Sequence, residues 1–592
     1  MKTTHRLLLA FVKADDGIKR IVVHRISFCK DTDLHRIDYL CIRNNPSMKS
    51  DNTFSLSGQI IDLVHSRIYP GRITVNDSKI TEIEELPMAE QRFILPGFID
   101  AHIHIESSMV PPSEFARMAV CNGTVATVSD PHEIANVMGV EGIDYMIRSG
   151  NRGHFKFFFG APSCVPATPF ETSGAKLDAQ TIETLMARDD IYYLAEMMNY
   201  PGVLADDPEI IKKLEAAKKH GKPIDGHAPM VTGDDIKKYV DSGISTDHEC
   251  YAIEDALEKV KLGTKILIRE GSAAKNFDAL IPLMAQYPEQ LMFCSDDMHP
   301  NDLIKGHINL LVQRALRKGY KLMDVLRATS LNAVRHYHLD VGLLQQGDDA
   351  DFIVVDNPTD LNILQTYIKG RLVAENGVSL MPRRKEEACN NFHAKTITEE
   401  DLRVEYEGKR IKVIACMDHN LITNTIVAEP KVVEGNVVSD TTRNILKMVV
   451  MNRYAPAKPA IGFIHNIGLK RGAIATSVAH DSHNIVAVGC SDEEIARAVN
   501  LLVYTKGGMV ACSETEFALL PLPIAGLMSL EEGSLVAKDY ERADKLAHEF
   551  GCTLYSPFMT LSFMALLVIP ELKLSDKGLF DVSRFGYTSL TE

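Results

Sequence analysis

The sequence predicts an α/β protein with a (β/α)8 barrel, a composite β-sandwich beside it and a C-terminal α+β domain. Three observations support this prediction. Eight strand-like runs alternate with helix-like stretches in the middle of the chain, and two β-rich segments flank that region. The chain also has 592 residues, which is too long for one hydrophobic core and corresponds to roughly three to four domains.

The alternating region has the spacing of βα units. Helix-like stretches such as Asp207 to His220 and Asp302 to Lys318 separate most strand candidates, and eight such units predict a closed barrel. A doubly wound open sheet is the structural rival, but it requires a glycine-rich phosphate turn after the first strand, and the sequence has none there. The strand candidates are Phe98 to Ile105, Thr124 to Ser129, Lys156 to Gly160, Ile191 to Met197, Pro223 to His227, Ile244 to His248, Lys265 to Arg269 and Leu291 to Ser295.

The flanking segments predict one β-sandwich built from both sides of the barrel region. Short strand-like runs separated by turn residues lie between Ser55 and Leu95, and again between Asp351 and Gly377. From about Lys385 the pattern changes to mixed strand-like and helix-like runs. The predicted division is an N-terminal extension at 1–50, expected to be poorly ordered, the composite sandwich at 51–96 and 341–385, the barrel at 97–340 and the C-terminal domain at 386–592.

Composition and charge argue against several functional classes. A formal net charge of -15 disfavours nucleic acid and anionic membranes as partners. The 11 cysteines form no C-x-x-C pair, which argues against a zinc ribbon or a secreted disulfide framework. The apolar run from Leu7 to Val12 is too short for a signal peptide, and no apolar stretch reaches the roughly 20 residues of a membrane span. We therefore expect a cytoplasmic protein.

The most informative segment runs from Pro96 to His104 and ends in two histidines. His102 and His104 are two residues apart, and in a strand such side chains point the same way. Both imidazoles are therefore expected to face one spot at the strand's end, where a divalent metal binds.

Further ligand-type residues stand at the ends of later strand candidates. Barrel enzymes place their chemistry where strands end, so these side chains are expected to meet and to hold two divalent cations bridged by a carboxylate. A single histidine beside an apolar run is more often a core or surface residue, but the repeated placement at strand ends favours ligands. The predicted metal ligands are His102, His104, Glu196, His227, His248 and Asp296.

This pattern resembles the amidohydrolase superfamily over roughly residues 55 to 385. Many members carry a carboxylated lysine at the end of the fourth strand, where this sequence has Glu196, a residue that bridges two cations without modification. Three more segments, Ser129 to Asn136, Arg269 to Asn276 and Ser477 to Asn484, extend the resemblance to the bacterial adenine deaminase family over nearly the whole chain after residue 50. Most amidohydrolases lack the C-terminal domain that contains the last segment.

The resemblance implies the hydrolytic deamination of adenine to hypoxanthine and ammonia, in purine salvage or catabolism. The implied substrates are adenine and water, the implied cations are manganese or iron, and we expect a homo-oligomer. Replacing the exocyclic amine requires a metal-activated hydroxide and a group that carries a proton to the ring nitrogen or the leaving amine.

We assign residue roles on this basis. Asp296 is expected to accept the proton of the hydroxide in addition to binding metal, and the other candidate catalytic residues are His132, Glu133 and Asp297. The candidate substrate-binding residues are Asp130, Arg269, Glu270, His480, Asp481 and His483.

Structural explanations for several of these residues stay open. Asp130 before Pro131, and Asp297, are also typical of helix caps. Arg269 and Glu270 are also typical of a surface ion pair. The motif at 480–483 fits three readings: completion of the site, another metal site or a capped loop.

Three rival functions remain at this point. Another amidohydrolase reaction, on a cyclic amide or an N-acetyl sugar, uses nearly the same site. A non-catalytic scaffold is disfavoured because all six ligand positions are filled. Cytidine-deaminase zinc chemistry finds its H-x-E in His104-Ile105-Glu106, but its P-C-x-x-C is absent.

Overall fold

Eight strands in the middle of the chain form two parallel sheets. The computed structural model describes residues 53–272 and 274–592, so the predicted extension at 1–50 lies outside the described residues. One parallel sheet contains β5 to β9 and a second contains β10 to β12. The strands are β5 (Phe98–Ile103), β6 (Thr124–Ser129), β7 (Lys156–Ala161), β8 (Tyr193–Met197), β9 (Ile224–Gly226), β10 (Thr246–Asp247), β11 (Lys265–Arg269) and β12 (Leu291–Cys294).

Two contacts join these sheets into a TIM-barrel-type fold, as the sequence predicts. A parallel bridge links Ile103 at the end of β5 to Asp296 just beyond β12. On the other side, the backbone amide of Ser245 donates to the carbonyl of Ile224 at a distance of 2.9 Å. The ends of β5 and β12 are therefore neighbours, although nearly 200 residues separate them in the sequence.

The helices between the strands follow the expected pattern, with one correction. The helix predicted at Asp207 to His220 is α6 (Pro208–Lys219), whose first turn is capped by the carboxylate of Asp207. The single helix predicted from Asp302 to Lys318 is wrong, because the chain forms α10 (Pro300–Leu303) and α11 (Ile308–Arg317) with a break between them. The backbone of His307 leaves the helical conformation (φ -138°, ψ -135°), and its ring contacts Asp100 of β5.

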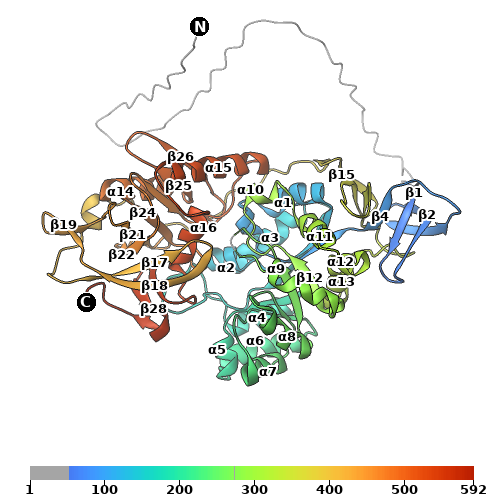
Figure 1. The fold of residues 1–592 in the computed structure, drawn as a ribbon, viewed down its shortest axis with the longest axis horizontal. Helices are drawn as coiled ribbons and strands as arrows, with labels where there is room; N and C mark the ends of the chain where they lie inside the picture. The colour runs from blue at the N-terminus through green and yellow to red at the C-terminus, as the bar shows by residue number, and fades with distance from the viewer. Residues whose placement is uncertain (1–52, 273) are drawn as a thin grey trace, which may run out of the picture. The chain divides into compact units, whose positions relative to one another are not determined.

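Strands from both flanks of the barrel share one eight-stranded sheet, and Figure 1 shows β1, β2 and β4 beside β15. At its centre β4 pairs in parallel with β1 and antiparallel with β13. Ile60 and Phe352, one from each flank, belong to the same buried apolar cluster. The strands are β1 (Thr53–Asp62), β2 (Arg67–Asn76), β3 (Lys79–Glu85), β4 (Phe93–Pro96), β13 (Phe352–Val355), β14 (Ile363–Ile368), β15 (Arg371–Glu375) and β16 (Val378–Ser379).

A second eight-stranded sheet forms the centre of the C-terminal region, with the order β18-β17-β22-β21-β24-β23-β25-β26. The strands are β17 (Ile411–Met417), β18 (Asn420–Ala428), β21 (Ile445–Met451), β22 (Ala460–His465), β23 (Ala473–Thr476), β24 (Ile485–Gly489), β25 (Gly508–Cys512) and β26 (Phe517–Pro521), and the main helices are α14 (Asp492–Thr505), α15 (Gly533–Glu549) and α16 (Pro557–Ser562).

The C-terminal region contacts the barrel beside the loop that follows β5. The amide of Ser529 donates to the carbonyl of Met109 at 2.8 Å, and the amide of Gly533 donates to Oε1 of Glu114 at 3.0 Å. This contact matters for function because the loop after β5 directly follows His102 and His104.

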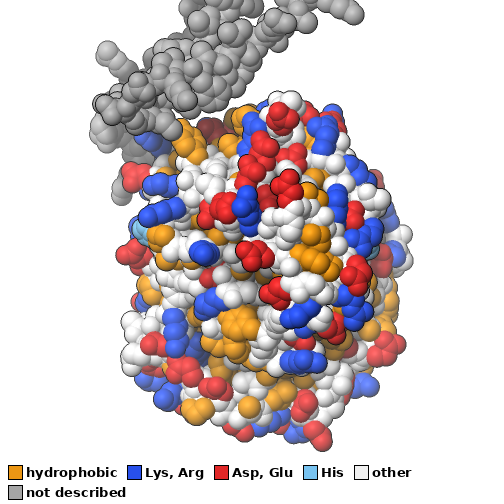
Figure 2. Space-filling view, turned by 90° about the vertical axis from the view of Figure 1, so that its left-hand side faces the viewer, with side chains coloured by type: hydrophobic (Ala, Val, Ile, Leu, Met, Phe, Trp, Pro, Cys, Tyr) orange, Lys and Arg blue, Asp and Glu red, His pale blue; other side chains and the backbone are white. Residues whose placement is uncertain are grey.

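The surface shows acidic and basic side chains interspersed over the face drawn in Figure 2. This face therefore carries no extended field of one sign. Among the described residues, no helix combines the length and the apolar character that crossing a bilayer requires.

Candidate metal centre and catalytic site

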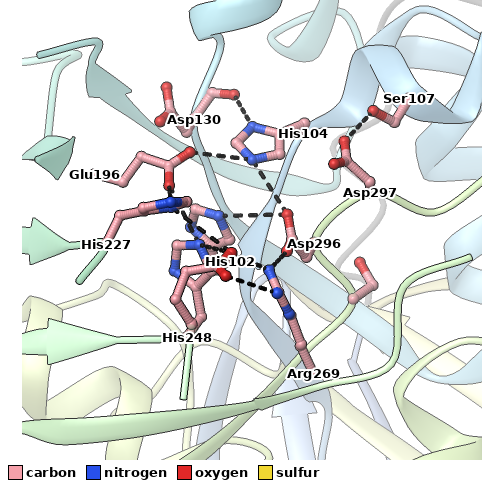
Figure 3. A network of polar contacts seen from close by, with 12 residues as sticks. His102, His104, Ser107, Asp130, Glu196, His227, His248, Arg269, Asp296 and Asp297 are labelled. Carbon is pink, nitrogen blue, oxygen red and sulfur yellow. Dashed lines mark hydrogen bonds and ion pairs between the residues drawn. The ribbon is translucent and has the colours of Figure 1, made fainter. Parts of the chain in front are cut away.

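The six predicted ligands meet at the carboxyl ends of the barrel strands, around the carboxylate of Glu196. Oε2 of Glu196 lies 2.8 Å from Nδ1 of His227 and 3.2 Å from Nε2 of His248. Its other oxygen, Oε1, lies 3.3 Å from Nε2 of His104. Glu196, at the end of β8, thus presents one oxygen to each of two groups of imidazoles, as Figure 3 shows.

Asp296 closes the cluster on the opposite side. Its Oδ1 lies 3.3 Å from Nε2 of His104 and 3.8 Å from Nε2 of His102. The ring of His102 stacks on the ring of His248, with 4.1 Å between the ring centroids. Side chains from five strand ends therefore converge on one spot, although the chain separates them by up to 194 positions.

The donor set fits divalent cations. Both ring nitrogens of His102 are buried and have no hydrogen-bond partner within the protein. Burial, together with His248 and His104, holds the pKa of His102 well below its usual value, so this imidazole is neutral and offers its lone pair. Two three-residue sets, His102 with His248 and Asp296, and Glu196 with His227 and His248, keep their ligand atoms within 4.8 Å of one another. Imidazole with carboxylate suits zinc, iron and manganese.

A buried network behind the ligands fixes the ends of β5 and β12. The carboxylate of Asp100 accepts hydrogen bonds from the amide of Ser295 at 3.0 Å, from its hydroxyl, and from Nε2 of His307 at 2.8 Å. Thr124 holds the other ring nitrogen of His307 at 2.7 Å. Asp100 also accepts a hydrogen bond from the amide of His102 at 3.3 Å. One carboxylate therefore contacts the ends of both β5 and β12, which carry predicted ligands.

Arg269 lies against Asp296, one of the predicted metal ligands. Its guanidinium donates to Oδ2 of Asp296 and, through both terminal nitrogens, to the carboxylate of Glu249. The sequence predicted that Arg269 would line the substrate pocket, whereas its contacts orient Asp296. Glu249 was not predicted, although its position directly after His248 was an available signal.

Glu270 lies apart from the cluster of predicted metal ligands. Its carboxylate pairs with Arg314 of α11 at 3.0 Å. Neighbouring residues of an extended segment point to opposite sides, so when Arg269 faces the ligands, Glu270 faces away from them.

Asp130 and His132 lie beside Glu196 at the start of α2 (His132–Met138). The carboxylate of Asp130 accepts from the amide of His132 at 3.0 Å and lies 3.2 Å from its Nδ1, while the backbone carbonyl of Asp130 accepts from Nδ1 of His104 at 3.1 Å. Nδ1 of His132 also lies 3.3 Å from Oε1 of Glu196. Asp130 thus orients two histidines, one of which is a predicted ligand.

Asp297 lies to one side of the ligands in Figure 3, where the hydroxyl of Ser107 donates to its Oδ1. Burial raises the pKa of Asp297, with Asp296 contributing in the same direction and His480 opposing it. Its contact to Ser107 is not that of a helix cap, and one of its oxygens lies within 4.8 Å of ligand-type atoms of His104 and Asp296.

Two histidines of the C-terminal motif contact Glu133 of the barrel region. Nδ1 of His480 contacts Oε1 of Glu133, and Nε2 of His483 contacts Oε2. Nε2 of His132 lies 3.5 Å from Glu133. His480 and His483, predicted to bind substrate, are therefore engaged with a predicted catalytic carboxylate.

Asp481 differs from the two histidines beside it. It is buried, and its Oδ2 has no hydrogen-bond partner. One of its oxygens lies within 4.8 Å of ligand-type atoms of His132 and Glu133, and burial raises the pKa of Asp481 to about 6. This carboxylate has an oxygen free to accept a hydrogen bond from a bound molecule.

Comparisons with known proteins agree with the two parts of the site. The model of the amidohydrolase family matches residues 93–373, and the model described as adenine deaminase C-terminal domain matches residues 420–586. A curated adenine deaminase of Methanosarcina barkeri is 53% identical over 542 residues, which cover 90% of this chain and 98% of that protein. Curated adenine deaminases of Salinibacter ruber and Parabacteroides distasonis are 53% and 50% identical, covering 90% and 92% of this chain and 98% and 100% of theirs.

Among solved structures, the β-aspartyl dipeptidase of Fervidobacterium islandicum AW-1 is 16% identical with a TM-score of 0.42, and the match covers 55% of this chain and 97% of that chain.

Proposed function

The chain belongs to the adenine deaminase family, and we propose that it hydrolyses adenine to hypoxanthine and ammonia. The observation that carries this proposal is the cluster of four imidazoles and two carboxylates around Glu196, with the unpartnered nitrogens of His102 among them. Family membership supplies the substrate, since curated relatives at about 50% identity over their full length are adenine deaminases.

Two divalent cations, which we propose to be manganese or iron, supply a hydroxide nucleophile at neutral pH when they are bound. The proposed ligands are His102, His104, Glu196, His227, His248 and Asp296. Glu196 would contribute to holding both cations, because each of its oxygens faces a different group of imidazoles.

We propose that Asp296 takes up the proton that the nucleophile loses. Arg269 engages its Oδ2, which leaves Oδ1 directed at the imidazoles of His102 and His104. The guanidinium keeps the carboxylate ionised and in one orientation, and a general base requires both.

His132 and Glu133 are the proposed carriers of a proton to the ring nitrogen or to the leaving amine. They form a continuous path with Glu196, through distances of 3.3 Å and 3.5 Å at His132. Asp297 and the free oxygen of Asp481 are the proposed acceptors for N–H groups of the purine. Asp481 is buried beside His132 and Glu133, and Asp297 is half-buried beside His104 and Asp296.

We further propose the domain division stated from the sequence, with the sandwich at 51–96 and 341–385, the barrel at 97–340 and the C-terminal domain at 386–592. The sheet shared by both flanks supports the first of these. The expected homo-oligomer and cytoplasmic location stay predictions.

A direct assay tests the function. The purified chain is loaded with Mn²⁺, adenine is added, and the absorbance change to hypoxanthine is followed together with ammonia release. Dihydroorotate and N-acetylated sugars are run in parallel, because a related amidohydrolase site would act on them. Turnover of either alternative without ammonia release from adenine would overturn the proposal.

A further inference from the structure

We propose that His480 and His483 are positioning residues that hold the carboxylate of Glu133 in a single orientation for proton transfer. This inference rests on the proposed function, in which Glu133 carries a proton during deamination. It assigns these two histidines of the C-terminal region a role in the chemical step rather than in binding adenine.

The contacts occupy both oxygens of Glu133. His480 engages Oε1 through Nδ1 and His483 engages Oε2 through Nε2, across 347 and 350 positions of sequence. All three side chains are buried. A carboxylate held at both oxygens has lost its rotation about the terminal bond, so its remaining lone pairs point in fixed directions, one of them towards His132 at 3.5 Å.

The orientation of His483 is itself fixed. The backbone amide of Ala479 donates to Nδ1 of His483 at 3.2 Å, so in the neutral ring the proton must be on Nε2, which then donates to Glu133. Arg453 steadies the same loop, since its side chain donates to the carbonyl of His483 at 3.3 Å and its amide donates to Asn484 at 3.1 Å.

His480 is fixed by packing instead. The ring of Phe563 stacks on it, with centroids 4.5 Å apart and an angle of 16° between the planes. Rigid support of this kind is what a catalytic group needs, because a displacement of about 1 Å costs up to about 10²-fold in rate.

The charges around Glu133 agree with this arrangement. Burial lowers the pKa of His480, but Glu133 and Asp297 outweigh this effect and raise the pKa to about 9. Burial lowers the pKa of His483 to about 4. At its two oxygens Glu133 is therefore paired with one cation, His480, and one neutral donor, His483.

Isosteric variants give a sharp test because the two histidines use different nitrogens. The amide nitrogen of asparagine overlies Nδ1 of histidine, and that of glutamine overlies Nε2. His480→Asn and His483→Gln keep a donor to Glu133, whereas His480→Gln and His483→Asn remove it. His336 of α13 (Leu331–Tyr337), which contacts Ser245 through Nε2 at 3.2 Å far from Glu133, provides the control variant His336→Gln.

We expect His480→Gln and His483→Asn to lower kcat for adenine by about 10- to 100-fold. The matched variants His480→Asn and His483→Gln should stay within about fivefold of wild type, and His336→Gln should equal it. For all five variants we expect an unchanged KM, an unchanged inhibition constant for hypoxanthine and unchanged bound Mn²⁺. In a Glu133→Gln background the histidine variants should cause no further loss, since residues that act through one another are not additive.

Two results would overturn the inference. One is an equal loss of kcat in matched and mismatched variants, which would indicate that ring packing alone matters. The other is a rise in KM and in the hypoxanthine constant at unchanged kcat, which would make the histidines substrate ligands. Absence of ammonia release by the wild-type chain would instead refute the proposed function, so the two failures are distinguishable. If one mismatched variant has a lowered thermal midpoint, the pair at the other histidine decides the question.

Discussion

Replacing Asp100 by asparagine should weaken metal binding far more than it weakens the fold. The carboxylate receives four hydrogen bonds, two at each oxygen, from His102, Ser295 (twice) and His307. Asparagine keeps one acceptor oxygen and presents an NH2 group in place of the other, so two of the four donors lose their acceptor. Each lost bond costs about 0.5–1.5 kcal/mol, which gives about 1–3 kcal/mol in total.

This cost has two different readouts. Because 1.4 kcal/mol is a factor of ten, metal affinity should fall by about 5- to 150-fold if the strand ends that carry His102 and Asp296 lose their alignment. The thermal midpoint of a chain of this length should fall by only about 1–3 °C, since the unfolding entropy grows with size. The assay is ammonia release from adenine and bound metal, each measured over a graded series of free Mn²⁺ concentrations.

Asp100→Asn should reach wild-type activity at high Mn²⁺ and lose it at low Mn²⁺. A metal dependence equal to that of wild type would refute the idea that Asp100 aligns the two strand ends. A loss of activity that saturating Mn²⁺ does not restore would refute it as well, because the damage would then lie in the chemistry.

Four other outcomes are expected. Asp296→Asn should lower kcat by about 10²- to 10⁴-fold and leave hypoxanthine inhibition nearly unchanged, and a kcat equal to wild type would exclude Asp296 as the base. Arg269→Lys should lower kcat/KM by about 10- to 100-fold, because a lysine does not reproduce the paired contacts to Glu249 and Asp296; wild-type kinetics would contradict this. Removing metal with a chelator should abolish turnover and lower the free energy of unfolding by about 5 kcal/mol, if both sites are first saturated at a free metal concentration of 100 times Kd. Adding Mn²⁺ should restore both. Full activity of the chelated protein would refute the metal site. Burial lowers the pKa of Lys573 to about 7. Between about pH 7 and 10 the unfolded chain therefore binds one more proton than the folded chain, and the free energy of unfolding rises with pH. Lys573→Met should be most stabilising, relative to wild type, near pH 7, and a pH-independent difference measured by denaturant unfolding would contradict this.

The strand ends were the part of the site most open to prediction. His102, His104, Glu196, His227, His248 and Asp296 each follow an apolar run, and parallel strands of a barrel end at the same rim. The position of each residue at a strand end therefore predicted which distant side chains would meet, and the structure brings these six side chains together.

Contacts between elements could not be predicted in the same way. His307 stands where a continuous helix is expected, and its role depends on the ring reaching Asp100 at 2.8 Å. Arg269 was a predicted site residue, but its contacts with Glu249 and Asp296 were not predicted. In each case the partner lies 20 or more positions away in the sequence, and neither periodicity nor spacing encodes such a contact.

For the motif at 480–483, the sequence indicated function but not the contact partner. Its unusual composition identified it as functional, but nothing local to it indicates Glu133, since the two segments meet only when the C-terminal region packs on the barrel. The sequence therefore predicted that the motif matters without predicting what it touches.

The distance along the chain between Glu133 and His483 has a consequence for biosynthesis. Every proposed cation ligand has been synthesised by residue 296, whereas the two histidines that contact Glu133 are added nearly two hundred residues later. All proposed cation ligands are therefore present in the nascent chain before the residues that position Glu133 are made. Under the proposal, translation of the last third of the chain completes the catalytic site.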